Sequence, residues 1–222
     1  MNADQTRICG ALTAVAAPTE LAAVPGLHIW CANLAALAAD AHYFESLLDA
    51  AEHEEIQRLR HEHDRRAMIL RRGVRRVVLG RELDCAPERL HFERASQGKP
   101  CVPGLFFSAS SSQQTALLAV ARGAEVGVDV EDTSAFKFSS ALADLCCCRA
   151  ECECLAAAPA TEKSAAFLRL WTAKEAVLKL RGTGFRELVD LPNLLQQLSS
   201  NERVVELPLA PPLVASLALR GA

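Results

Sequence analysis

The stretch GVDVED, residues 127–132, constrains the fold more tightly than any other part of this 222-residue chain. Valines occupy the even positions from 126 to 130, whereas Asp129 and Glu131 occupy odd positions. Successive side chains of a strand point to opposite faces, so the valines share one face and the two carboxylates share the other. Adjacent carboxylates repel each other and raise each other's pKa unless a positive group lies between them. The stretch therefore predicts a strand whose acidic face requires a cation.

The rest of the chain alternates strand and helix patterns. Strands are expected at 26–34, 89–96, 104–112, 115–123, 125–132, 203–207 and 213–219, with a glycine turn joining 115–123 to 125–132. Helices are expected over 43–79 as two in series, 139–157 and 164–182, with a loop at 97–104. This order indicates an α+β protein with a flexible N-terminal extension (1–25), an N-terminal half (26–103) and a C-terminal half (104–222).

Charge and hydropathy exclude several classes of protein. The formal net charge is −3, so no global basic field favours nucleic acid. No apolar run has the length of a membrane span. The first residues faintly resemble a signal peptide, but Asp4 interrupts the positive start, which favours a loosely ordered extension and a cytoplasmic protein.

Nine cysteines raise the question of a disulfide framework or a metal site. Five of them lie in CCCRAECEC, residues 146–154, and no histidine follows Cys154. A structural zinc site usually pairs C-x2-C with a second such pair or with histidines downstream. The pattern favours reduced, partly buried thiols, with a cysteine-rich metal-binding or regulatory module as the alternative.

A second acidic motif lies in the helix expected at 164–182. Glu175 and Lys179 are four residues apart in WTAKEAVLKL and share one helix face. If this helix packs beside GVDVED, a third carboxylate joins Asp129 and Glu131. Three carboxylates suit Mg²⁺, which prefers oxygen ligands and leaves positions for water and phosphate. Lys174 and Lys179 then suggest a polyphosphate substrate. Taken alone, Glu175 and Lys179 could be a surface pair worth about 0.3–0.5 kcal/mol.

In this order, GVDVE and W-x-x-K-E-A resemble the signature of 4′-phosphopantetheinyl transferases, in particular the surfactin-synthetase-activating, two-domain monomeric type. GKP at 98–100, GLHIW at 26–30 and the arginine-bearing DRRAMILRRGVRR at 64–76 support the resemblance. It implies two pseudo-symmetric α/β halves with the active site in the cleft between them. It also implies Mg²⁺-dependent transfer of phosphopantetheine from coenzyme A to a serine of an acyl, peptidyl or aryl carrier protein, with release of 3′,5′-ADP; Mn²⁺ could replace Mg²⁺.

The resemblance also implies roles for individual residues. The metal would be held by Asp129, Glu131 and Glu175. Coenzyme A would be bound by Lys179 at its phosphates, by Lys99, Arg66 and Arg71 at its adenine–ribose phosphate end, and by Ser110 and Ser111. The catalytic candidates are Glu175, Lys174 and Glu151: Glu175 or a metal-bound water is the preferred proton acceptor, Lys174 a weaker one, and Glu151 a further acid near the site.

One departure from the family pattern affects coenzyme A binding. The family usually has F-N-L-S-H-S where this chain has FSASSS, residues 107–112, so Ser111 replaces a histidine that contacts the 3′-phosphate. A serine donates one hydrogen bond and carries no charge, which costs about 1 kcal/mol of binding. We expect an active enzyme. The alternative is a catalytically weakened protein of the same fold that binds coenzyme A or a carrier protein.

Arginines between residues 58 and 81 have three interpretations. The simplest is a solvated helix face on which they pair with Glu54, Glu55, Glu62 and Asp64. A site for an acidic carrier-protein helix comes second. A nucleic-acid site comes last, because the chain has few aromatic residues to stack on bases.

Overall fold

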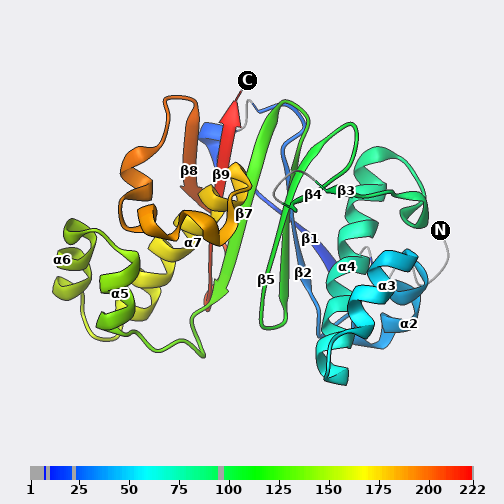
Figure 1. Ribbon diagram of the computed structural model, residues 1–222, viewed down its shortest axis with the longest axis horizontal. Coiled ribbons are helices and arrows are strands. Elements are labelled where there is room, and N and C mark those ends of the chain that lie inside the picture. The colour runs from blue at the N-terminus through cyan, green and yellow to red at the C-terminus, as the bar shows by residue number, and fades with distance from the viewer. Residues whose placement is uncertain (1–7, 9–10, 22–23, 95–97, 222) are drawn as a thin grey trace.

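The computed structural model describes residues 8, 11–21, 24–94 and 98–221. It is a mixed α+β protein in which two larger antiparallel sheets are flanked by helices and two short strands form a third, smaller sheet (Figure 1). The first sheet has the strand order β1-β2-β6-β5. Its strands are β1 (Leu12–Val15), β2 (His28–Asn33), β5 (Phe106–Ser112) and β6 (Thr115–Ala121). Helices α2 (Ala41–Ser46), α3 (Ala50–Gln57) and α4 (Glu62–Leu83) lie on its outer side. The expected mixed α+β fold is confirmed.

The second sheet has the strand order β7-β9-β8. Its strands are β7 (Ala124–Asp132), β8 (Glu202–Glu206) and β9 (Leu213–Gly221). Helices α5 (Ser140–Cys146), α6 (Arg149–Ala157) and α7 (Lys163–Arg181) flank it, and a 3₁₀ segment (Gly184–Gln197) follows α7. Helix α7 ends where Gly182 adopts a left-handed conformation, φ +71°, as expected for a glycine just beyond a helix.

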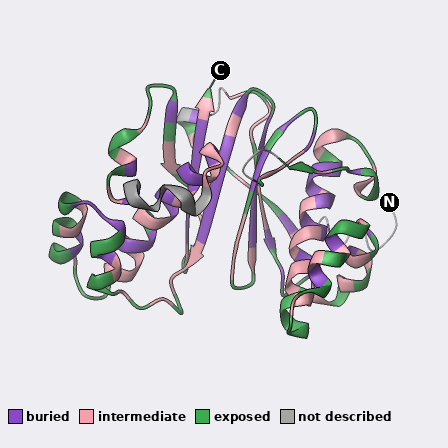
Figure 2. Cartoon of the chain, in the orientation of Figure 1, coloured by how far each residue is buried: buried purple, intermediate pink, exposed green. Residues whose placement is uncertain are grey.

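An apolar layer joins the two sheets. Val126, Val128 and Val130 are fully buried and belong to one core cluster with Leu117 of β6 and Leu217 of β9. The buried colour in Figure 2 accordingly runs along the central strands. The valine face predicted from GVDVED is therefore the face that packs between the sheets, and the odd-numbered face of β7 is left for α7.

Strands β5 and β7 lie side by side at the centre but belong to different sheets. Three serines of β5 connect them. The Ser108 Oγ accepts from the Val128 amide at 3.1 Å, Ser110 donates to Asp129 at 2.6 Å, and Ser112 donates to Glu131 at 2.7 Å. Because the serines recur every second residue, all three point to the same side of β5. The serine-rich end of this strand therefore joins the two halves of the molecule.

Several boundaries differ from those expected. The prediction of a flexible N-terminal extension is wrong for residues 11–21, because Leu12–Val15 pairs with β2 and the buried Leu12 joins the core. The strand expected at 89–96 is reduced to β3 (Glu93–Arg94), which pairs with β4 (Pro100–Cys101) inside the expected loop. Residues 1–7, 9–10, 22–23 and 95–97 lie outside the described part of the chain.

The boundary between the halves also differs. β5 and β6, expected after a boundary near Pro103, complete the sheet that begins with β1 and β2. The sheets divide at Arg122–Gly123, where the chain passes from β6 to β7. The glycine turn between the two strands is therefore a crossing between sheets. Sequence patterns locate strands well, but which strands pair depends on distant partners.

A buried carboxylate fastens the second sheet to the end of α7. Glu202, at the start of β8, accepts hydrogen bonds from Arg181 at 2.8 and 3.1 Å and from the Ser199 amide at 3.1 Å. These bonds lower the pKa of Glu202 to about 2, the Arg181 side chain contributing most. A carboxylate with a depressed pKa in the folded state stabilises the fold above its ordinary pKa, and the contribution is lost as pH falls toward the folded value.

We therefore expect Glu202→Gln to lower the free energy of unfolding at pH 7, with a difference from the parent protein that shrinks as pH falls from about 4.5 toward 2. Urea unfolding at a series of pH values measures this difference. A deficit that stays constant down to pH 2 contradicts the assignment of the low pKa to Glu202.

Within the described residues, no helix combines the length and the apolar character needed to cross a bilayer.

Candidate functional site

Helix α7 lies directly on β7 because position 127 is glycine. A Cβ built on Gly127 would lie 2.0 Å from the Ala176 carbonyl oxygen and 2.4 Å from the Leu180 nitrogen, so no side chain fits between strand and helix. Glycine allows this close approach of two backbones. Glu175 precedes Ala176 in the helix, and Lys179 follows it by three residues. The contact brings both side chains beside Asp129 on the strand.

A lysine and a serine hold Asp129. Its Oδ1 accepts from the Lys179 ammonium at 2.6 Å and from the Ser110 hydroxyl at 2.6 Å, and Lys179 also donates to the Ser110 oxygen at 2.9 Å. Asp129 is only 4% exposed, whereas the Lys179 side chain is 30% exposed. The second oxygen of Asp129, Oδ2, is buried and has no hydrogen-bond partner among the described residues.

Glu175 and Glu131 complete the acidic group. Burial raises the pKa of Glu175, and Asp129 and Glu131 add to the rise against the opposing effect of Lys179. Burial also raises the pKa of Glu131, which the Ser112 hydrogen bond partly offsets. The Oε1 atom of Glu175 is buried without a partner in the described structure. Two buried carboxylate oxygens without partners are costly unless a further group binds there.

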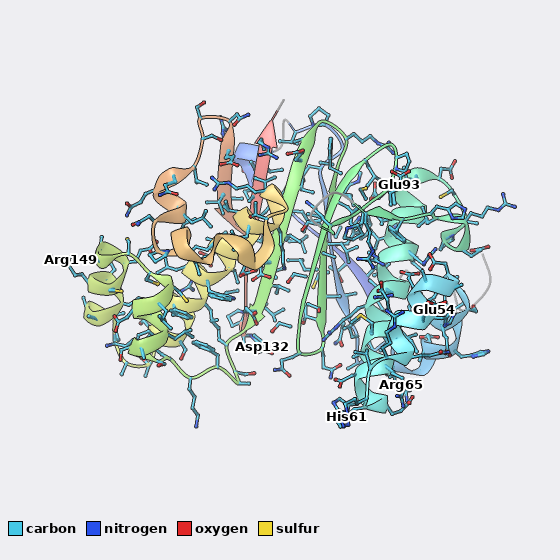
Figure 3. The ribbon with its side chains drawn as sticks, in the orientation of Figure 1. Glu54, His61, Arg65, Glu93, Asp132 and Arg149 are labelled. Carbon is cyan, nitrogen blue, oxygen red and sulfur yellow. The ribbon has the colours of Figure 1, made fainter. Side chains whose placement is uncertain are left out.

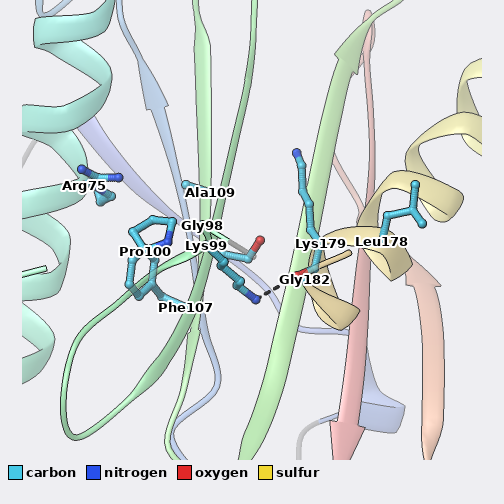
Figure 4. A pocket seen from close by; sticks show the side chains of 10 residues that line it. Arg75, Gly98, Lys99, Pro100, Phe107, Ala109, Leu178, Lys179 and Gly182 are labelled. Atoms are coloured by element: carbon cyan, nitrogen blue, oxygen red, sulfur yellow. Dashed lines mark hydrogen bonds between the residues drawn. The ribbon is translucent and has the colours of Figure 1, made fainter. Parts of the chain in front are cut away.

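A cavity of about 340 Å³ lies beside this acidic group, between the two halves (Figure 4). Lys99, Phe107 and Ala109 line it on the side of the first sheet, and Lys179 and Gly182 line it on the side of α7. Volumes of this size are typical of small-molecule sites. The cavity therefore lies in the cleft that was predicted between the halves, and two of the lysines predicted to bind coenzyme A, Lys99 and Lys179, line it.

Lys99 also connects the two halves. Its ammonium donates to the Val126 carbonyl at 2.9 Å and to the Lys179 carbonyl at 2.9 Å, the second bond being the dashed line in Figure 4. The second carbonyl belongs to the last turn of α7, where carbonyls lack intrahelical partners. Burial lowers the pKa of Lys99, with Glu125 opposing. Lys99 thus holds the end of α7 while lining the cavity.

The other predicted coenzyme A residues are more scattered. Arg66 is exposed on α4 and donates to the Ala38 carbonyl at 2.7 Å. Arg71 is half-buried, with an Nε that has no partner in the described regions. Ser111 follows Phe107 and Ala109 on the face of β5 opposite the three bridging serines. The structure brings none of these three into the lining of the cavity.

Arg75 was absent from the sequence-based set, yet it lines the cavity from α4 (Figure 4). The available signal was its spacing, because Arg75 lies one helical turn after Arg71 and shares its face. That signal was hidden by the many arginines around it. Of these, Arg58, Arg65 and Arg72 form the expected pairs with Glu54, Glu62 and Glu55. Figure 3 shows Glu54 and Arg65 on the outward side of the helices.

Lys174 and Glu151 form a separate buried pair. The Lys174 ammonium is 2.7 Å from Glu151 and donates to the Cys146 and Pro192 carbonyls at 2.6 and 3.1 Å. Glu151 also accepts from the Cys148 amide at the start of α6. With Lys174 only 1% exposed, this pair connects α7 to α6 and does not face Asp129. Its predicted catalytic role stays a prediction, whereas its structural contacts are clear.

We expect Lys174→Met to lower the free energy of unfolding by about 3–5 kcal/mol, because it leaves Glu151 buried without its cation. Glu151→Gln should cost less, and the double variant should recover part of the loss. Urea unfolding of the two single variants and the double variant measures the coupling between the side chains. Additive losses would show that the pair is not coupled.

The cysteine-rich segment contains no disulfide among the described residues. Cys146, Cys147 and Cys148 are buried, and burial raises the pKa of Cys147 to about 12. Within the described ranges, no group of three or more His, Cys, Asp or Glu side chains is arranged to hold a metal ion. The cysteines therefore pack as small apolar residues, the interpretation that their sequence pattern favoured.

The fold and the site define an α+β protein with a lysine-lined cleft between two halves and a group of carboxylates beside it. The family model of the 4′-phosphopantetheinyl transferase superfamily matches residues 125–211, which include Asp129, Glu131, Glu175 and Lys179. The 4′-phosphopantetheinyl transferase HetI of Nostoc sp. is 30% identical over 171 residues, which cover 74% of this chain and 72% of that protein.

Two other relatives match shorter stretches. The 4′-phosphopantetheinyl transferase AcpT of Salmonella typhimurium is 33% identical over 123 residues, 54% of this chain and 62% of that protein. The 4′-phosphopantetheinyl transferase Sfp of Bacillus subtilis is 27% identical over 144 residues, 64% of this chain and 63% of that protein. The chain therefore belongs to the 4′-phosphopantetheinyl transferase superfamily and is a transferase of that class.

Proposed function

We propose that this enzyme transfers the 4′-phosphopantetheine group of coenzyme A to a serine of an acyl, peptidyl or aryl carrier protein and releases 3′,5′-ADP. The observation that carries the proposal is the convergence of Asp129, Glu175 and Lys179 beside a cavity lined by a second lysine, Lys99. Carboxylates for a divalent metal and ammonium groups for phosphates are the parts that phosphoryl chemistry needs.

The acidic group has the oxygen donors that a divalent cation requires, although in the described structure its three side chains are not arranged to hold one. Asp129 and Glu175 each present a buried oxygen without a partner among the described residues, and the pKa values of Glu131 and Glu175 are raised by burial first and by the neighbouring negative charge second. Oxygen donors of this kind suit Mg²⁺, or Mn²⁺ in its place. Asp129, Glu131 and Glu175 would hold the ion after their side chains turn toward one another. Bound there, the ion supplies electrostatic stabilisation of the charge on the transferred phosphoryl group.

The chain's own residues supply binding and proton transfer. The serine oxygen of the carrier forms a bond to the β-phosphorus of coenzyme A, and the bond from that phosphorus to the oxygen of 3′,5′-ADP breaks. Lys179, whose side chain is 30% exposed, would bind the phosphates once it leaves Asp129. Glu175, whose raised pKa suits a proton acceptor, would accept the proton of the attacking serine. Lys174 is a poorer acceptor, because its ammonium is enclosed by Glu151 and two carbonyls.

The same geometry supports the two-domain, monomeric subtype. One chain supplies both walls of the cavity, from β5 and from α7, so a second copy is not needed to complete it. We propose that the enzyme acts as a monomer on free carrier proteins. Size-exclusion chromatography with light scattering measures this, and activity confined to a dimer contradicts it.

The experiment that tests the proposed reaction is intact-mass measurement of an apo carrier protein after incubation with this enzyme, coenzyme A and Mg²⁺. A mass gain of one phosphopantetheine, absent when EDTA is added, is the expected result. No gain with several carriers, together with calorimetric binding of coenzyme A, favours the alternative of a catalytically weakened binding protein. No gain and no binding exclude both.

A further inference from the structure

The acidic group already has a cation beside it, the ammonium of Lys179. This ammonium donates to the Asp129 carboxylate at 2.6 Å and to the Ser110 hydroxyl at 2.9 Å. Burial raises the pKa of Glu131 and of Glu175, and the positive charge of Lys179 opposes the rise at both. One cation therefore acts on all three carboxylates, and it belongs to the chain itself.

The ammonium of Lys179 is an incomplete counter-ion. It brings one positive charge to three carboxylates, and it contacts Oδ1 of Asp129 but not Oδ2. That Oδ2 atom and Oε1 of Glu175 are buried and have no hydrogen-bond partner in the part of the chain that the structure describes. In the same part of the chain, the three acidic side chains are not arranged to hold a metal ion. Lys179 thus stabilises the acidic group in an arrangement that differs from a metal site.

Lys179 and a divalent cation compete for Asp129. The Asp129 side chain is only 6% exposed, so little water screens the charges around it. An ammonium and a divalent ion on one small carboxylate would lie close together and repel each other strongly in such surroundings. A divalent cation at Asp129 must therefore displace the ammonium or bind weakly.

The cavity beside the acidic group can receive the displaced ammonium. The Lys179 side chain is 30% exposed and lines the cavity from the α7 wall (Figure 4). Because the stem of a lysine is flexible, the ammonium can move while the helix stays in place. Lys99, the other cavity lysine, is held by the Val126 and Lys179 carbonyls and connects the halves instead. Lys179 is therefore the lysine that can exchange one partner for another.

We propose that Lys179 is a built-in counter-ion that a divalent metal ion must displace from Asp129, and that the displacement delivers its ammonium to an anion in the cavity. The inference rests on the proposed function, which makes a divalent ion and the phosphates of coenzyme A the ligands of this site. Metal and anion are linked through one side chain, because each binds better when Lys179 leaves Asp129. This linkage is reciprocal, so the acidic group holds a metal weakly until the anion is present.

Calorimetric titration with Mn²⁺, without coenzyme A or carrier protein, tests the competition. Lys179→Met removes the ammonium and keeps an unbranched side chain. Mn²⁺ should bind this variant about 10- to 100-fold more tightly than the parent enzyme, because no charge-assisted hydrogen bond has to be broken. Lys179→Arg keeps the charge and should keep the weaker affinity of the parent. An affinity for Mn²⁺ that is unchanged or lower in Lys179→Met overturns the proposal.

Lys163→Met is the matched control. Lys163 is the first residue of the same helix, about 24 Å from Lys179 at the rise of an α-helix, and its ammonium lies 5.9 Å from the centre of the Phe138 ring. The variant makes the same substitution away from the acidic group, so it should bind Mn²⁺ as the parent does. A gain equal to that of Lys179→Met would assign the effect to net charge and overturn the proposal.

A second comparison does not depend on the folding of a Lys179 variant. With EDTA present, Asp129→Asn frees the ammonium without a metal, and coenzyme A should bind this variant more tightly than the parent enzyme. Glu131→Gln removes one negative charge from the same strand but leaves the pair of Lys179 and Asp129 in place, so its gain should be smaller. Equal gains in the two variants, or no gain in Asp129→Asn, contradict the proposal.

These measurements need no turnover, so they remain separate from the proposed reaction. If the parent enzyme modifies no carrier protein, the proposed reaction fails, and the Mn²⁺ titration still decides the role of Lys179. If neither the parent enzyme nor Lys179→Met binds Mn²⁺, the counter-ion role is overturned, whatever the outcome of the transfer assay.

Discussion

Glu175→Gln should abolish nearly all carrier modification while leaving the fold intact. The amide keeps the volume of the side chain but loses the charge that a divalent cation and the proton transfer require. Removing a ligand that stabilises a phosphoryl transition state by several kcal/mol corresponds to a rate loss of about 10³-fold. Intact-mass measurement of the carrier over time, at saturating coenzyme A and Mg²⁺, gives this loss.

The stability of the same variant separates catalysis from folding. The pKa of Glu175 is raised in the folded protein, so its ionised form costs stability above its ordinary pKa. Without added metal at pH 7, Glu175→Gln should therefore unfold at a temperature no lower than the parent. Glu153→Gln, an exposed glutamate paired with Arg149 on α6, is the control and should keep full activity. An inactive variant that is also unfolded, or a fully active one, contradicts the role of Glu175.

Gly127→Ala should have the second largest effect. The added methyl would overlap the Ala176 carbonyl at 2.0 Å, and its neighbours are backbone atoms that cannot rotate away. Overpacking of this kind costs about 1–3 kcal/mol and sometimes more. Since α7 must move off β7, Glu175 and Lys179 move away from Asp129, and we expect activity to fall further than stability does.

Thermal unfolding and carrier modification measure the two effects of Gly127→Ala. Gly221→Ala, in β9 of the same sheet, is the control, because a Cβ at Gly221 meets nothing within 4 Å. It should change neither property. If Gly127→Ala retains the parent activity and melting temperature, the close packing of α7 on β7 does not position the site.

Local patterns in the sequence predicted the parts of the site that depend on one element. The alternation in GVDVED gives the two faces of β7, and the four-residue spacing places Glu175 and Lys179 on one face of α7. These inferences need only strand and helix periodicity. The packing of α7 on β7 is harder to predict from the sequence pattern, although Gly127 marks the point of contact.

Other features depend on partners that no local pattern reveals. Lys174 is adjacent to Glu175 in the sequence but points into the core toward Glu151, because neighbouring residues on a helix face different directions. Leu12–Val15 becomes a strand only because β2 presents an open edge. Arg75 lines the cavity because of the face that α4 turns toward it, and the run of arginines in the sequence conceals which face that is.

The chain passes from one sheet to the other at Arg122–Gly123, and this position determines where it can be cut into two fragments that each keep a whole sheet. Strand β2 pairs with β6, and β7 pairs with β9, so each sheet joins segments that are far apart in the chain. A cut near Pro103 would separate β2 from its partner and leave a fragment with an open edge. A cut at 122–123 would leave both sheets whole, with the serines of β5 as docking contacts. Two fragments divided there should reassemble into an enzyme whose cavity forms only on association, which suits this chain to use as a split reporter.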